Sequence, residues 1–179
     1  MSIIDLRMFT GKAMISTRNA SETYKIGQSL GEIIDSPVVI TLDGELGSGK
    51  TVFVKGLAAG LEVTKPVRSP TFTLMAVYQG RIPIYHFDFY RLNDESELEP
   101  LGLEEYLEGD EGAVFVEWAE KFPDVLPPYR LGIEITYNYS GTDLQYRDIT
   151  FHPRGDPYFT LIDRLLCVVE YDRRGELNK

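Results

Sequence analysis

The sequence predicts a single α/β domain, with a mixed central sheet flanked by helices. Two observations predict this fold class. Apolar runs of strand length alternate with segments of helical periodicity, and two pairs of strands lie close enough in sequence to form antiparallel hairpins. The chain has 179 residues, 43% of them apolar, which fits one globular domain. We expect this domain to span residues 1–170 and a polar, frayed tail to follow at 171–179.

The first helix is predicted from its capping residues and its apolar spacing. Asn19 followed by Glu22 is a variant of the capping box, and apolar residues recur from Ile26 with helical spacing. The helix is expected to end before Pro37, because the residue that precedes a proline disfavours the helical conformation. Further helices are expected at residues 51–61 and 158–170, with short ones between residues 93 and 120.

Runs rich in apolar, β-branched and aromatic residues predict the strands. The run at residues 38–42 is apolar throughout, as expected for a strand that is buried on both faces of a sheet. Two pairs of strands have hairpin-like connections, the second around Ser140 and Gly141. The predicted strands are 13–16, 38–42, 72–78, 82–90, 113–118, 129–139 and 145–151.

Negative charge is concentrated in one stretch, residues 93–120, which we call the acidic block. It holds eleven of the 28 acidic residues and no Lys or Arg, so the rest of the chain is close to neutral despite a formal charge of -10. One interpretation is a solvated face of the protein. The other is a docking surface for a basic partner, or a shield against nucleic acid.

Composition excludes several classes of protein. A pI near 4.7 disfavours direct binding of nucleic acid through its phosphates. No apolar run approaches the length of a spanning helix, so no membrane association is expected. Cys167 is the only cysteine, which excludes an intramolecular disulfide and favours a cytoplasmic protein. We interpret Cys167 as a core residue of the last helix.

One motif carries a specific chemistry. The stretch from residue 44 to residue 51 matches G-x-x-x-x-G-K-[ST] in full, and it lies between a predicted buried strand and a predicted helix. In that context the backbone N–H groups point at phosphate oxygens, and the helix N-terminus favours negative charge. The motif consists of Gly44, Glu45, Leu46, Gly47, Ser48, Gly49, Lys50 and Thr51.

The motif predicts binding of a nucleoside triphosphate with Mg²⁺. Lys50 is expected to bridge the β- and γ-phosphates, and the Thr51 hydroxyl is expected to ligate the metal. The base-reading motif [NT]-K-x-D of GTPases does not occur in the sequence, which favours ATP.

Two carboxylates compete for the metal or the attacking water. Glu117 ends an apolar strand, and Asp88 lies in a strand rich in aromatic residues. Either could instead be a charge that faces water, and the sequence does not assign their roles. His86 flanks Asp88 and is interpreted as a packed or surface histidine; with His152 it is one of only two histidines, too few for a zinc cluster with one cysteine.

Several strings together resemble the TsaE family, the bacterial P-loop ATPases of tRNA threonylcarbamoyladenosine biosynthesis. Their order and spacing match that family between about residues 16 and 139. The strings are Gly44–Thr51, Ser69–Leu74, His86–Leu92, Leu101-Gly102 and Glu117–Glu120.

This resemblance implies a small P-loop domain that hydrolyses ATP slowly with Mg²⁺. It also implies action on a complex of the proteins TsaD and TsaB, so that tRNA is reached only through partners. By the same resemblance Thr71 lies in a switch-like segment, Asp88 and Glu117 are the important acids, and Trp118 is an aromatic companion of the nucleotide site.

Two other functions remain open from the sequence. A small-molecule P-loop kinase would share the loop and the size, but it normally has arginines in a lid, and only Arg173 and Arg174 are available by composition. A nucleotide sensor that does not hydrolyse ATP would act only as an interaction module.

Overall fold

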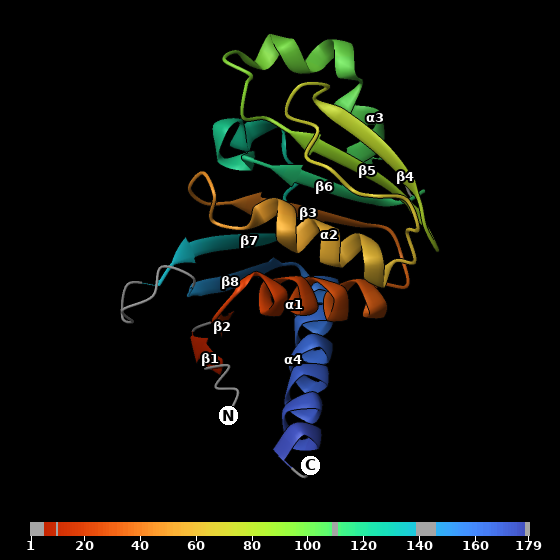
Figure 1. Ribbon diagram of the computed structural model, residues 1–179. Coiled ribbons are helices and arrows are strands. Elements are labelled where there is room, and N and C mark those ends of the chain that lie inside the picture. The colour runs from red at the N-terminus through yellow and green to blue at the C-terminus, as the bar shows by residue number, and fades with distance from the viewer. Residues whose placement is uncertain (1–5, 10, 109–110, 139–145, 178–179) are drawn as a thin grey trace.

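The computed structural model describes residues 6–9, 11–108, 111–138 and 146–177. Within these residues eight strands form one sheet, in the order β1-β2-β8-β7-β3-β6-β5-β4 (Figure 1). The strands are β1 Leu6–Phe9, β2 Lys12–Thr17, β3 Val38–Asp43, β4 Met75–Gln79, β5 Pro83–Asp88, β6 Ala113–Glu117, β7 Arg130–Tyr137 and β8 Arg147–Arg154. The helices are α1 Ala20–Ile33, α2 Lys50–Gly60, α3 Leu103–Glu108 and α4 Asp156–Leu177, with 3-10 helices η1 Glu95–Leu101, η2 Ala119–Lys121 and η3 Pro123–Val125.

The sheet is mixed, as predicted. The four strands β7, β3, β6 and β5 are parallel to one another, whereas β1, β2, β8 and β4 join by antiparallel pairing. Both predicted hairpins are present as antiparallel pairs, β4 with β5 and β7 with β8. The turn expected around Ser140 and Gly141 lies outside the described residues. The predicted α/β class with a mixed sheet and flanking helices is therefore confirmed.

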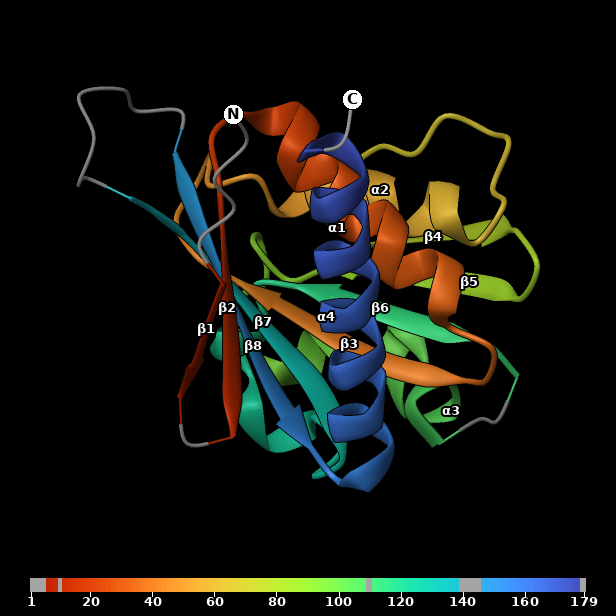
Figure 2. The ribbon, with the colours of Figure 1, turned by 90° about the horizontal axis from the view of Figure 1, so that it is seen from below.

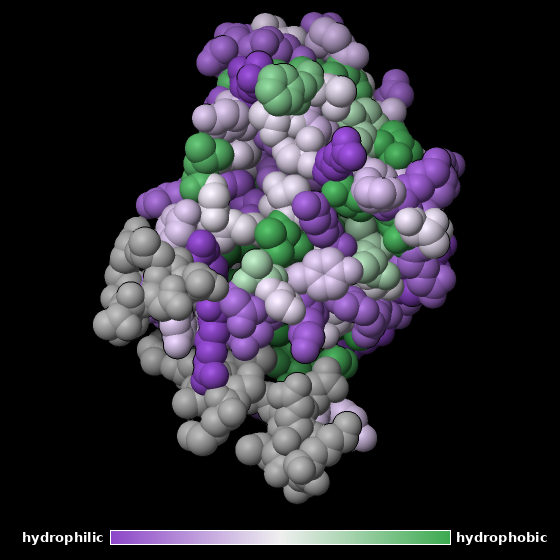
Figure 3. Space-filling model, viewed as in Figure 1, coloured by the Kyte–Doolittle hydropathy of each residue, from purple (hydrophilic) through white to green (hydrophobic). Residues whose placement is uncertain are grey.

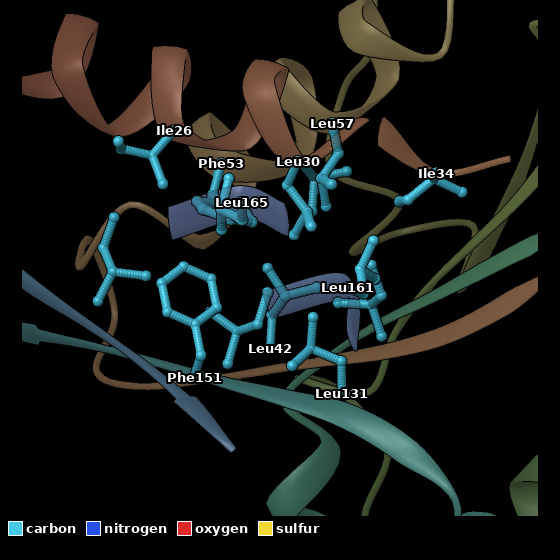
Figure 4. Close-up of a cluster of buried hydrophobic side chains, with 14 of the residues drawn as sticks. Ile26, Leu30, Ile34, Leu42, Phe53, Leu57, Leu131, Phe151, Leu161 and Leu165 are labelled. Atoms are coloured by element: carbon cyan, nitrogen blue, oxygen red, sulfur yellow. The ribbon is translucent and has the colours of Figure 1, made fainter. Parts of the chain in front are cut away.

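Two hydrophobic clusters cover the two faces of the sheet. Helices α1, α2 and α4 lie on one face (Figure 2). There their side chains pack against those of β3, β7 and β8 (Figure 4). The short helices η1, α3, η2 and η3 contribute to a smaller cluster with β3, β5 and β6. Because neighbouring residues of a strand point to opposite faces, Glu117 lies on the α2 face, two residues after the buried Phe115.

Helices α1 and α2 pack closely through glycines. A Cβ atom at Gly56 would lie 2.1 Å from the carbonyl oxygen of Tyr24, and one at Gly27 would lie 2.3 Å from that of Phe53. Only glycine allows the two backbones to approach this far. The contact fixes α2, and with it the loop that precedes α2.

The beginning of α1 has the predicted capping residues, with one change of partner. The Asn19 side chain accepts a hydrogen bond from the backbone N–H of Glu22 (3.0 Å). The Glu22 carboxylate accepts from the N–H of Arg18 (2.8 Å), one residue earlier than in the standard box.

Some sequence predictions about these elements are wrong. β4 begins at Met75 and not at residue 72, because the preceding residues form a turn that is bonded to Asp88. The strand β1 was not predicted. Helix α4 continues from Asp156 to Leu177 and does not end at Glu170, so residues 171–177 are helical. Cys167 is exposed and is not a core residue, because the buried stripe of α4 runs through Leu165, Leu166 and Val169.

No helix among the described residues has the length and apolar character needed to span a membrane.

Candidate nucleotide-binding site

The glycine-rich loop leaves the carboxyl end of β3 and enters α2. Gly44, Gly47 and Gly49 have φ angles of 132°, 79° and 114°, in the region that favours glycine. A Cβ atom at Gly44 would lie 2.2 Å from the carbonyl oxygen of Ile135 on β7, so a side chain has no room there. The loop therefore curls tightly against the sheet, as its glycine spacing predicts.

The helix that follows the loop begins without a side-chain cap. Gly49 is the N-cap residue of α2, and as a glycine it makes no side-chain hydrogen bond to the first N–H groups of the helix. Uncapped N–H groups and the positive end of the helix dipole make this helix end a site for an anion such as a phosphate.

Lys50 is the first residue of α2, and its side chain folds back onto the loop. The residue is only 4% exposed. Its Nζ atom donates hydrogen bonds to the carbonyl oxygens of Gly44 (2.6 Å) and Glu45 (2.9 Å). Burial lowers the pKa of Lys50, and the carboxylates of Glu117 and Glu120 oppose this effect most strongly. The ammonium group thus lies inside the loop, where phosphate oxygens are expected.

Trp118 covers the Lys50 ammonium group. The Nζ atom lies 3.8 Å from the centre of the Trp118 ring, a cation–π contact. Trp118 has a φ angle of 62°, in the left-handed region, which is uncommon for a bulky residue. Its ring also contacts that of Tyr90, with the ring centres 5.0 Å apart. The structure therefore brings Trp118, predicted from the family resemblance, next to the loop lysine.

Glu117 is the acid next to Thr51, the last residue of the motif. It is 2% exposed, at the end of β6 and beside Leu42 of β3 in the sheet register. The Thr51 hydroxyl donates to the Glu117 carboxylate, at 3.1 Å from Oε1 and 3.0 Å from Oε2. The Nε2 atom of His86 lies 2.9 Å from Glu117 Oε1. Two residues predicted to ligate a metal, Thr51 and Glu117, are therefore in direct contact.

Asp88 lies beside Glu117 but binds a different segment. The two acids are register partners at the carboxyl ends of β5 and β6. Asp88 is 1% exposed, and its Oδ2 atom accepts from the hydroxyls of Ser69 and Thr71, both at 2.6 Å. Its Oδ1 atom accepts from the backbone N–H of Tyr90 (3.0 Å). Asp88 thus holds the segment that was predicted to act as a switch.

The other residues of the motif lie in the same loop. The backbone carbonyl of Glu45 accepts from Lys50, and the backbone carbonyl of Leu46 accepts from the Tyr137 hydroxyl (3.2 Å). Leu46 is 69% exposed. The Ser48 Oγ atom is buried and has no hydrogen-bond partner among the described residues. A buried hydroxyl without a partner is costly, and a ligand in the loop could satisfy it.

Two features of the site were not predicted from the sequence. The first is a cavity of about 120 Å³ beside the loop, lined by Thr23 of α1, by Ser48 and by Arg147 of β8, among others. Arg147 donates through Nε to the carbonyl of Ser48 (2.8 Å) and stacks on Tyr137, with its guanidinium carbon 4.0 Å from the ring centre. No local pattern marks Arg147, because it reaches the loop from a strand almost 100 residues later.

The second missed feature is a pair of carboxyl groups, Asp43 and Glu120. Asp43 precedes the loop, and its Oδ1 atom accepts from the backbone N–H of Glu120 (2.9 Å). Partial burial raises the pKa of Glu120 to about 8, and a hydrogen bond to the Asp43 side chain adds to the rise. Proximity of two carboxyl groups favours the protonated form of one of them.

The residues present fit ATP with Mg²⁺. The loop offers an uncapped helix end, a buried lysine and an unpartnered hydroxyl to a polyphosphate. Within the described part of the chain, no three His, Cys, Asp or Glu residues are placed to hold a metal by themselves. Mg²⁺ is usually held by one or two protein oxygens together with phosphates and water. Thr51 and Glu117 supply such oxygens.

The fold and this loop define a P-loop nucleotide-binding protein, with the loop at the carboxyl end of a central parallel strand. Comparison with known proteins narrows this class. The family model described as "Threonylcarbamoyl adenosine biosynthesis protein TsaE" matches residues 17–147, and the chain belongs to the TsaE family.

Relatives support this assignment over most of the chain. The tRNA threonylcarbamoyladenosine biosynthesis protein TsaE of Bacillus subtilis is 43% identical over 150 residues, which cover 83% of this chain and 90% of the relative. The protein of the same name from a Nostoc species is 41% identical, with coverage of 78% and 87%. The crystal structure of Bacillus subtilis YdiB superposes with a TM-score of 0.74 at 36% identity, covering 89% of this chain and 97% of that one. The family resemblance drawn from the sequence is confirmed.

Proposed function

We propose that this protein is an accessory ATPase of tRNA threonylcarbamoyladenosine biosynthesis, which binds ATP with Mg²⁺ and hydrolyses it slowly. The observation that carries the proposal is the phosphate loop with Lys50 folded into it, next to Thr51, whose hydroxyl donates to the buried Glu117. The proposed pathway follows from the family to which the chain belongs, because the description of the family model names threonylcarbamoyl adenosine biosynthesis. A role in tRNA modification fits a cytoplasmic protein.

Lys50 and the backbone amides of residues 44–51 would hold the triphosphate. Lys50 would exchange its two carbonyl partners for phosphate oxygens, which are stronger acceptors for an ammonium group. The exchange also relieves the cost of burying this cation, which is visible as the lowered pKa.

Thr51 and Glu117 would hold Mg²⁺, which when bound supplies positive charge against the negative charge of the phosphates. Glu117 would orient the attacking water and accept its proton. Asp88 would keep Ser69 and Thr71 at the site, so that this segment can sense the γ-phosphate. Trp118 would remain beside the lysine and limit access of water.

The cavity beside the loop is where we place the nucleoside. It adjoins Gly47, Ser48 and Gly49, and it extends to Ala20 and Thr23 at the start of α1. The guanidinium group of Arg147 offers a flat cationic surface on which a base can stack.

TsaD and TsaB are the proposed partners, and the acidic block is the proposed docking surface. A groove of about 520 Å³ in this block has Leu98, Leu103 and Val125 in its lining. Four glutamates also line it, which gives the groove a negative rim: Glu95, Glu99, Glu104 and Glu105. Figure 3 shows hydrophilic side chains around a few hydrophobic ones at this end of the molecule, where Figure 1 draws η1 and α3. Charge complementarity favours a basic partner surface, and tRNA would be reached only through that partner.

Phosphate release tests the activity. We expect slow release by the purified protein, a change in rate when TsaB and TsaD are added, and loss of release in Lys50→Ala and Glu117→Ala. Turnover that neither substitution lowers would show that the site is wrongly assigned. Stoichiometric transfer of phosphate to a metabolite would favour a kinase, and binding without hydrolysis under every condition would favour a nucleotide sensor.

Charge reversal tests the docking surface. Glu104, Glu105 and Glu108 are changed to Lys together, and binding to immobilised TsaB–TsaD is measured with and without ATP. The matched control reverses Asp163 and Glu170, two exposed acids of α4. We expect only the first variant to lose binding; equal binding of both variants would remove the acidic block from the interface.

A further inference from the structure

His86 is a buried histidine that neither the sequence nor the family comparison explains. It lies on β5, two residues before Asp88, and none of its surface is exposed. Its Nε2 atom lies 2.9 Å from Oε1 of Glu117, which is itself 2% exposed. Its Nδ1 atom is buried and has no hydrogen-bond partner among the described residues. The expectation of an ordinary packed or surface histidine therefore misses a direct contact with the central acid of the site.

The contacts of the two side chains determine where the histidine proton lies. A carboxylate only accepts hydrogen bonds, so the Nε2 atom that faces Glu117 must be the donor. The Nε2 atom of His86 is thus assigned a proton that points at the Glu117 carboxylate.

The same geometry fixes the orientation of the carboxylate. Glu117 Oε1 receives hydrogen bonds from both His86 and Thr51. The Thr51 hydroxyl is within hydrogen-bond distance of both carboxylate oxygens of Glu117. By itself it therefore does not fix the rotation of the carboxylate about its bond to the side chain. His86 comes from a neighbouring strand of the sheet and has no exposed surface, so its position does not depend on a mobile segment.

We propose that His86 is a positioning residue for Glu117: its Nε2–H holds the carboxylate in one orientation, so that Glu117 remains in place when Thr51 turns from it to a metal ion. The inference rests on the proposed function, because it concerns binding of Mg²⁺ with ATP at this site. An outer donor to a metal-binding side chain typically changes metal affinity by about 10- to 100-fold when it is removed.

Two substitutions separate hydrogen bonding from packing. His86→Leu replaces the imidazole with an apolar side chain of similar size and so removes the hydrogen-bond donor. His86→Gln retains an N–H group that can reach the same position. His152→Leu is the matched control, because His152 is the other histidine of the chain and pairs with Glu134, outside the site (3.7 Å).

The measurement is ATP affinity by titration calorimetry, with Mg²⁺ and with EDTA. We expect His86→Leu to reduce the gain in affinity that Mg²⁺ provides by about 10-fold or more, with affinity in EDTA unchanged. His86→Gln should recover most of this gain, and His152→Leu should behave as wild type. Thermal unfolding of each variant without nucleotide shows that it is folded.

Further variants complete the design. In a Glu117→Ala background, His86→Leu should have no additional effect on the Mg²⁺ dependence, because the carboxylate that His86 orients is absent. An undiminished gain from Mg²⁺ in His86→Leu would overturn the positioning role. Lys50→Ala separates this result from failure of the proposed function: if Lys50→Ala binds ATP as wild type does, the site itself is wrong, whatever His86 does.

Discussion

The hydroxyl of Thr71 provides a test of how the segment before β4 is held. Thr71 and Ser69 both donate to Oδ2 of the buried Asp88, and their own hydroxyl oxygens are 2.5 Å apart. Thr71→Val keeps the shape of the side chain and removes one donor to a charged acceptor. Hydrogen bonds to charged groups contribute about 1.5–3 kcal/mol, and Thr71 is only half-buried. We therefore expect a loss near the lower end, about 1.5 kcal/mol of unfolding free energy.

Urea unfolding followed by fluorescence measures this loss. Thr73→Val is the matched control in the same segment, because Thr73 is an exposed residue whose hydroxyl donates only a long hydrogen bond, 3.5 Å, to the carbonyl of Pro70. The control should lose less than about 0.5 kcal/mol. In an Asp88→Asn background the effect of Thr71→Val should shrink, because the charged acceptor is gone. Equal losses for Thr71→Val and Thr73→Val would refute the view that Asp88 anchors this segment.

Two further predictions concern charge. Glu120→Gln removes a titrating carboxyl group. The pKa of this group in the folded protein is about 8, above the ordinary 4.5. The free energy of unfolding of the wild type should therefore fall relative to that of this variant as pH rises from about 4.5 to 8. The expected fall is roughly 1–2 kcal/mol, because solvent screens this exposed side chain. Unfolding measured at several pH values checks the prediction, and parallel pH profiles of the two proteins would contradict it. Arg81→Ala removes donors to the carbonyls of Gly31, Ile34 and Gly60 at the ends of α1 and α2, and it should cost about 2–3 kcal/mol. Arg164→Ala, which breaks an exposed ion pair with Asp35 (3.0 Å), should cost less than about 0.5 kcal/mol in the same unfolding assay, and equal costs for the two arginines would count against the role of Arg81.

The parts of the fold and site that the sequence predicts are those with local signals. Residues 44–51 are contiguous, and their glycines, lysine and threonine each have a defined place in the loop, so the motif identifies them without a structure. The strand before the loop and the helix after it are likewise marked by apolar runs and helical spacing. Glu117 follows an apolar strand directly, which is why it was found.

The contacts that were not predicted join residues far apart in the sequence. His86 and Glu117 are 31 positions apart, and they meet only because β5 and β6 are neighbours in the sheet. Arg147 reaches the loop through the pairing of β7 with β8. The expected strand at residue 72 fails for a similar reason: Phe72 has a strand-forming side chain, yet it is 81% exposed in a turn that Asp88 holds.

The prediction for α4 shows the limit of periodicity. Apolar spacing located the helix correctly but did not give its end, because the residues after Tyr171 are polar and can continue a helix without an apolar stripe. Cys167 was assigned to the core for its apolar neighbours in sequence, although a helix turns by about 100° per residue and places it on the exposed side.

The most direct test of the central claim is a crystal structure with a non-hydrolysable ATP analogue and Mg²⁺. The triphosphate should occupy the loop of residues 44–51, and the Lys50 ammonium group should have left the carbonyls of Gly44 and Glu45 for phosphate oxygens. Mg²⁺ should lie at about 2.1 Å from the Thr51 hydroxyl, with Glu117 beside it. A nucleotide bound away from this loop, or Lys50 still bonded to the two carbonyls beneath a bound triphosphate, would contradict the claim.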